Sequence, residues 1–143
     1  MPFPSKEQIQ QAMEKENNIS ILELTQSKIK QEKNDILQRL QLDRTKLKLF
    51  HKKLKQYRYI QSIQDIVVGN YIRWINVSNP ENIRLTNGAI VTDFKEAEET
   101  TYLVCKTLQS RFFNVDINKC LLFQKLNLQE ETLLTVINYL EKK

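Results

Sequence analysis

A heptad pattern of apolar residues between Ile19 and Tyr57 is the feature that most constrains how this chain can fold. With Ile19 at position a, nine of the twelve a and d positions are apolar, and neither glycine nor proline interrupts them. Residues with this spacing form a seam that a single helix cannot bury alone. The pattern predicts one long coiled-coil-like helix over residues 19–60 that packs against a partner. The predicted seam consists of Ile19, Leu22, Ile29, Ile36, Leu40, Leu47, Phe50, Leu54 and Tyr57.

Polar residues occupy three seam positions, Gln26, Lys33 and Asp43. In a coiled coil such residues restrict the register and the number of helices. The alternative is that the helix folds back on its own domain and these residues face water. Leucines outside the seam widen the apolar side of the helix, which favours a bundle over a two-stranded coil; they are Leu37, Leu42 and Leu49.

Two capping boxes mark helix starts near the N-terminus. Ser5 with Gln8 predicts a short lead helix or arm over residues 1–18, and Ser20 with Glu23 predicts the start of the long helix. One continuous helix with a stutter is the alternative.

After Tyr59 the pattern changes from helical to alternating. Five short strands are expected, with turn residues between them, over residues 71–77, 83–94, 101–108, 111–117 and 120–126. Asn87-Gly88 fits either a type I′ turn or a bulge in one long bent strand. We therefore expect an α+β fold, with a small five-stranded SH3-like antiparallel barrel over residues 65–126. Asn127 with Glu130 forms a further capping box and predicts a C-terminal helix over residues 127–143.

The net charge of +5 comes from one short stretch of the 143 residues. Between Arg44 and Arg58 there are seven bases and His51 but no acid, while both flanks are nearly neutral. Helical spacing brings Arg44, Lys48, Lys52 and Lys55 to one side, with Arg58 nearby. This side could bind the phosphates of a nucleic acid or an acidic protein. A solvated polar surface is the alternative.

Little in the sequence suits catalysis. His51 is the only histidine and is expected at an exposed helix position with no carboxylate to orient it. Two glycines cannot form a glycine-rich phosphate loop. Glu96, Glu98 and Glu99 fit a solvated turn better than a metal or acid–base site. We expect no enzymatic activity, no cofactor and no metal site.

Cys105 and Cys120 each lie in an apolar strand-like run without metal-ligand spacing, so we expect two buried, reduced thiols. No apolar run is long enough to span a bilayer, and the first residues lack the pattern of a signal peptide. These features predict an intracellular, reducing setting.

Five aromatic residues of the predicted barrel have two interpretations. They can fill the interior of a small barrel, or they can line a peptide groove on its surface. The core interpretation is favoured, and Trp74 is the residue best placed for a groove. The five are Tyr71, Trp74, Tyr102, Phe112 and Phe113.

Residues 68–75, Val-Gly-Asn-Tyr-Ile-Arg-Trp-Ile, are followed by residues 85–91, Leu-Thr-Asn-Gly-Ala-Ile-Val. This pair of segments, after a basic helical stretch, resembles a pattern in small proteins of nucleocytoplasmic large DNA viruses. The resemblance covers about residues 44–126 and does not include the heptad helix. It implies a minor virion component and carries no catalytic residues.

These observations lead to one main functional hypothesis and one alternative. The main hypothesis is a non-enzymatic structural or scaffolding protein, such as a minor capsid protein, that bridges other protein subunits through its helical seam. The expected product is a homo-oligomer or a larger assembly. It would reside in the virion or the host cytoplasm and would not be secreted. The alternative is an accessory protein that binds nucleic acid through the basic residues of 44–58.

Overall fold

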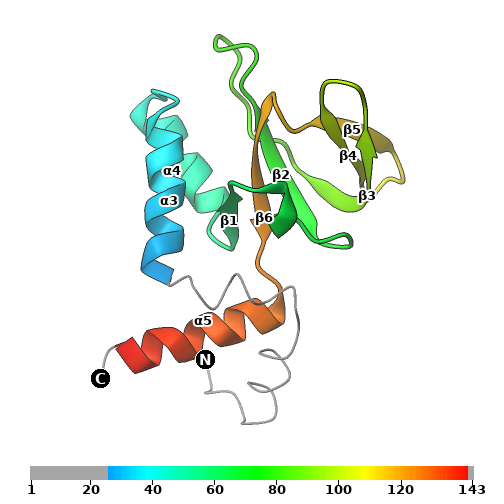
Figure 1. Ribbon diagram of the computed structural model, residues 1–143. Coiled ribbons are helices and arrows are strands. Elements are labelled where there is room, and N and C mark those ends of the chain that lie inside the picture. Colours follow the sequence, from blue (N-terminus) through cyan, green and yellow to red (C-terminus); the bar gives the residue numbers. More distant parts are fainter. Residues whose placement is uncertain (1–25, 142–143) are drawn as a thin grey trace. The chain divides into compact units, whose positions relative to one another are not determined.

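The computed structural model describes residues 26–141, which form two compact units (Figure 1). A helical unit comprises residues 26–53 and 126–141, and a sheet unit comprises Leu54–Lys125. The fold is α+β. The predicted lead helix, the Ser20–Glu23 capping box, and the seam residues Ile19 and Leu22 lie outside the described residues.

The prediction of one long helix through residue 60 is wrong. Within the described residues the heptad stretch forms two helices, α3 (Gln26–Gln38) and α4 (Arg44–Lys53), which contact each other. The turn between them places Gln41 at a φ of 53°, in the left-handed region. After α4 the chain leaves the helical conformation and enters a strand.

Asp43 explains why the helix restarts at this point. Its carboxylate accepts a hydrogen bond of 2.8 Å from the backbone N–H of Lys46, and its carbonyl accepts one from Leu47. This is the geometry of an N-cap, a position that aspartate stabilises by about 1 kcal/mol relative to alanine. The polar residue that we interpreted as an insertion in a seam is therefore the cap of a second helix.

The third described helix, α5 (Leu128–Glu141), begins with the capping box predicted from the sequence. The backbone N–H of Glu130 donates to the Asn127 side chain at 2.8 Å, and the Glu130 carboxylate accepts from the Asn127 N–H at 3.1 Å. Ile29 of α3 packs with Leu133 and Leu134 of α5 in the core of the helical unit. No helix within residues 26–141 is long and apolar enough to cross a membrane.

The sheet unit contains one antiparallel sheet with the strand order β1-β6-β2-β3-β4-β5 (Figure 1). The predicted five-stranded closed barrel is wrong, because the sheet has six strands and, in the described part of the chain, β1 and β5 each pair on one side only. The strands are β1 (Tyr57–Ile60), β2 (Tyr71–Asn76), β3 (Ala89–Glu96), β4 (Thr101–Lys106), β5 (Phe112–Asp116) and β6 (Cys120–Lys125).

Strand β1 lies where the heptad pattern predicted the end of the long helix. Leu54 and Tyr57 continue the apolar spacing of a helix, but the sequence Tyr-Arg-Tyr-Ile also has the aromatic and β-branched residues typical of strands. The structure pairs Tyr57 with Lys125 and Ile60 with Leu122, so β6 supplies the ladder that decides the conformation. This pairing joins residues more than sixty positions apart, and the local pattern contains no sign of it.

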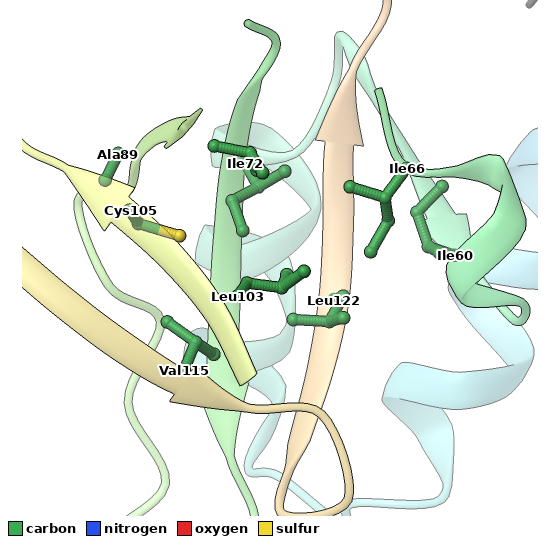
Figure 2. Close-up of a cluster of buried hydrophobic side chains, with 9 residues drawn as sticks. Ile60, Ile66, Ile72, Ala89, Leu103, Cys105, Val115 and Leu122 are labelled. Atoms are coloured by element: carbon green, nitrogen blue, oxygen red, sulfur yellow. The ribbon is translucent and has the colours of Figure 1, made fainter. Parts of the chain in front are cut away.

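Nine buried side chains from the six strands and from the loop between β1 and β2 form the core of the sheet unit (Figure 2). Ile72, Leu103 and Leu122 lie near its centre in the close-up. Trp74 is half-buried and packs against this cluster, as does Ile63 of the short 3₁₀ helix η2 (Ile63–Asp65). The cluster consists of Ile60, Ile66, Ile72, Ala89, Val91, Leu103, Cys105, Val115 and Leu122.

Asn87-Gly88 forms a bulge. The pairing of the chain with β2 shifts by one residue between Ile72↔Ala89 and Ile75↔Leu85, so one extra residue is accommodated there. Gly88 has a φ of 93°, a conformation that residues with a Cβ rarely adopt. Of the two alternatives left by the sequence, the bulge is the observed one, but β3 begins after it at Ala89 and not at Ile83 as expected.

Gln124 holds the long loop between β1 and β2 against the sheet. Its side chain is fully buried, accepts a hydrogen bond of 2.9 Å from the Val67 N–H, and donates one of 3.0 Å to the Asp65 carbonyl. A buried amide with both ends satisfied fixes the loop without an unpaired polar group.

Candidate functional site

Three basic side chains are aligned on the exposed side of α4. Arg44, Lys48 and Lys52 are each exposed and follow one another at intervals of four residues, which places them on one side of a helix. The helix contains no acidic residue. We call these three residues the α4 basic face. Thr45 and Leu49 lie beside it, and Leu49 has 45% of its surface exposed.

The opposite side of α4 anchors the helix. Phe50 is buried, with 4% of its surface exposed, and Leu47 is half-buried. Lys46 lies along this side with its ammonium 5.9 Å from the centre of the Phe50 ring, a cation–π distance. Burial of Phe50 thus turns the α4 basic face outward.

Helix electrostatics account for some of these bases and not for others. Cations are favoured in the last turn of a helix, where His51, Lys52 and Lys53 lie, and disfavoured in the first turn. Arg44 and Lys46 occupy that first turn. Lys46 is accounted for by its contact with Phe50, but Arg44 gains nothing from the helix dipole. The position of Arg44 therefore favours a role in binding a ligand over a role in stabilising the helix.

The other two predicted basic residues lie elsewhere. Lys55 is exposed in the turn that follows α4. Arg58 is buried in β1, with 4% of its surface exposed, and lies opposite Gln124 in the register of β1 with β6. The helical spacing that grouped all five residues ends where the helix ends. The structure therefore brings together three of them.

His51 is half-buried, and the exposed position we expected for it is wrong. Burial lowers its pKa below the usual 6.5, and the nearby Lys33 lowers it further. Lys33 is itself buried in α3, and burial together with Lys30 lowers its pKa to about 8. His51 is therefore neutral at pH 7 and adds no charge to the α4 basic face.

The predicted seam is not an exposed line of apolar residues. Ile29, Phe50, Leu54 and Tyr57 are buried within the described chain. The buried stripe of α3 follows the heptad positions at Ile29 and Lys33 but continues to Leu37, which lies outside the predicted seam. The remaining described members of the predicted seam are half-buried: Ile36, Leu40 and Leu47.

The acidic turn between β3 and β4 borders a shallow depression of about 640 Å³. Asp116, at its edge, accepts hydrogen bonds from the Asn118 N–H at 2.9 Å and the Thr100 hydroxyl at 2.8 Å. These bonds lower the pKa of the Asp116 carboxyl, which keeps it ionised and already occupied as an acceptor. Glu98 and Glu99 line the same depression and are exposed. No cluster of three metal-binding side chains occurs within residues 26–141.

Both cysteines are free thiols, with Cys105 buried and Cys120 half-buried. Burial raises the pKa of each thiol to about 11. A thiol with such a pKa stays protonated near neutral pH, and the protonated form is a poor nucleophile and metal ligand. These cysteines are suited to packing.

The aromatic residues of the sheet unit divide between core and surface. Trp74 packs on the core, and the Tyr71 hydroxyl donates to the Asn87 carbonyl at 2.9 Å. Phe112 and Phe113 of β5 are 63% and 48% exposed. Adjacent residues of a strand point to opposite faces, so two neighbouring phenylalanines cannot both enter one core. The adjacency of Phe112 and Phe113 in the sequence is itself a signal that one of them lies outside the core.

Comparison with protein-family models, curated proteins and solved structures finds no match to this chain.

Proposed function

We propose that this protein binds nucleic acid through the α4 basic face, with backbone phosphates as the ligands. The observation that supports this most directly is Arg44, an exposed base at the start of α4 where the helix dipole disfavours a cation. It is aligned with Lys48 and Lys52, and no acidic residue occurs from 44 to 64. An array of cations without interspersed acids is the usual form of a phosphate-binding surface.

The dimensions of this surface suit a duplex. Arg44 and Lys52 are separated by about 12 Å along the helix axis at 1.5 Å per residue. Over that length a DNA duplex carries about seven phosphates on its two strands. Three side chains can each meet a different phosphate, and such contacts carry no sequence information. We therefore propose binding without sequence preference.

The scaffolding hypothesis required a continuous helical seam. The turn at residues 39–43, between α3 and α4, interrupts that seam. Four of its residues are buried in the chain itself. Association through the seam has for this reason less support than binding through the α4 basic face. The resemblance to virion proteins remains a prediction.

The test is a titration of the full chain into labelled random-sequence duplex DNA at two salt concentrations. Three phosphate contacts predict a slope of about −2.7 for the logarithm of affinity against the logarithm of salt concentration. Affinity should therefore fall about forty-fold when salt rises fourfold. A double variant, Lys48→Glu with Lys52→Glu, should lower the affinity at least tenfold and reduce the slope by about two.

The matched control is Lys95→Glu with Lys125→Glu, which changes the net charge equally at two exposed lysines of the sheet unit. This control should keep most of the affinity. If both double variants weaken binding to the same degree, net charge explains the interaction and the proposed site is wrong. Absence of binding at low salt also contradicts the proposal.

A further inference from the structure

Strand β5 forms one end of the sheet (Figure 1). Its inner edge pairs with β4 in an unbroken register, from Lys106↔Phe112 to Tyr102↔Asp116. Among residues 26–141 no strand lies on the outer side. Edge strands are usually protected by proline, by lysine or by a bulge, and β5 has none of these.

The direction of the free backbone groups follows from two printed contacts of the β4–β5 ladder. The backbone N–H of Thr107 donates to the Arg111 carbonyl at 2.8 Å, and the backbone N–H of Ile117 donates to the Thr101 carbonyl at 3.3 Å. Because the backbone groups of an antiparallel strand alternate in direction, odd-numbered residues of β5 bond to β4 and even-numbered residues point away. Phe112 and Asn114 therefore present N–H and C=O groups to an incoming strand.

Two exposed phenylalanines lie on this edge strand, and its two ends carry opposite charges. Phe112 and Phe113 are 63% and 48% exposed. Arg111 precedes the strand, Asp116 ends it, and no charge lies between them. A second copy of β5 in antiparallel orientation would bring the Arg111 end of each strand to the Asp116 end of the other. A parallel copy would bring like charges together.

We propose that the chain forms a homodimer by antiparallel pairing of β5 with β5 across a two-fold axis. The two-fold axis must be perpendicular to the sheet, so each side chain meets one from the same face of the partner. The register that uses the outward groups of Phe112 and Asn114 pairs each Phe112 with Asn114 of the partner. Phe113 then lies directly opposite Phe113 of the second copy, and these two rings cover each other.

Sedimentation of the full chain at increasing concentration tests the dimer, and Asn114→Pro tests the edge. The Asn114 N–H points away from β4, so proline there removes no bond of the β4–β5 ladder and blocks only an added strand. We expect the wild type to dimerise and Asn114→Pro to raise the dimer dissociation constant at least tenfold, or about 1.4 kcal/mol. Unchanged circular dichroism will show that this variant folds.

A control variant tests whether dimerisation is only nonspecific association of exposed apolar residues. Leu108→Lys changes the most exposed large apolar residue in the described chain, at 79%, which lies in the turn between β4 and β5. It should dimerise as the wild type does. A wild type that stays monomeric, or a dimer that Leu108→Lys disrupts and Asn114→Pro does not, overturns the proposal.

Cross-linking tests the register. Residues facing each other in a non-hydrogen-bonded antiparallel pair have Cα atoms about 4.5 Å apart, within the range of a disulfide. Phe113→Cys should therefore give a disulfide-linked dimer under mild oxidation, much faster than Phe112→Cys, whose two copies are offset along the strands. Faster linkage through Phe112→Cys contradicts the pairing we propose.

Discussion

Two glycines with nearly the same backbone angle have very different surroundings. Gly69 has a φ of 97° and Gly88 one of 93°. A Cβ on Gly69 would meet no atom within 4 Å. A Cβ on Gly88 would collide with the Ile72 carbonyl oxygen and lie 2.8 Å from Tyr71 Cε1 and 2.9 Å from Arg73 Cγ. Conformation restricts both positions, and packing restricts only Gly88.

Gly88→Ala should therefore lower the free energy of unfolding by about 2–4 kcal/mol, because it adds overpacking to backbone strain. Gly69→Ala should lower it by only about 1–2 kcal/mol, from strain alone. Urea denaturation of both variants measures the difference. Equal losses would mean that the close approach at Gly88 does not exist in solution.

The buried thiols predict a dependence of stability on pH. Burial raises the pKa of Cys105 from 9.0 to about 11, so between these values the unfolded chain loses a proton that the folded chain keeps. Stability is complete below the lower value and decreases as pH rises through the higher one. At about 1.4 kcal/mol per pKa unit, the decrease due to Cys105 is roughly 2–3 kcal/mol.

Cys105→Ala tests this dependence. The variant should lose less stability than the wild type between about pH 8 and pH 11, although it starts lower because a buried group has been removed. Urea unfolding of both proteins across this range gives the comparison. The lowered pKa of Lys33 changes stability with pH in the opposite direction. Its contribution is the same in both proteins and cancels from the comparison. Parallel curves would rule out the proposed titration.

At the scale of elements, the turn between α3 and α4 corrects the strongest pattern in the sequence. Apolar spacing alone does not distinguish a long helix from two short ones that bury their apolar sides within the same chain. Asp43 was interpreted as an insertion in a seam, and its bond to Lys46 identifies it instead as the N-cap of α4. The capping box at Asn127 had no competing interpretation and was confirmed.

Gln41→Gly distinguishes two helices from one. In the turn, Gln41 has a φ of 53°, so glycine should raise the stability by about 0.5–1 kcal/mol. Within a continuous helix the same change would lower it by about 1 kcal/mol. Gln31→Gly, at an exposed position inside α3, provides the matched control and should destabilise. Thermal or urea unfolding measures both, and destabilisation by Gln41→Gly would contradict the turn.

At the scale of the whole molecule, the sequence predicted local order better than pairing. The alternating segments placed β2, β4, β5 and β6 close to their observed bounds, because period and turn residues are local signals. The sheet order was not predictable from them, since β6 pairs with both β1 and β2 across long stretches of chain. The α4 basic face was predictable as far as the helix extends, and Arg58 was misplaced because it lies on a strand.

The position of β6 has a consequence for dividing the chain. The last strand in the sequence lies inside the sheet, bonded on both sides, and the turn before it is exposed at Asn118 and Lys119. A chain divided in this turn yields two fragments, and the smaller one carries a strand that fits between β1 and β2. The protein is therefore a natural candidate for a split reporter, in which recovery of the folded sheet signals that the two fragments have met.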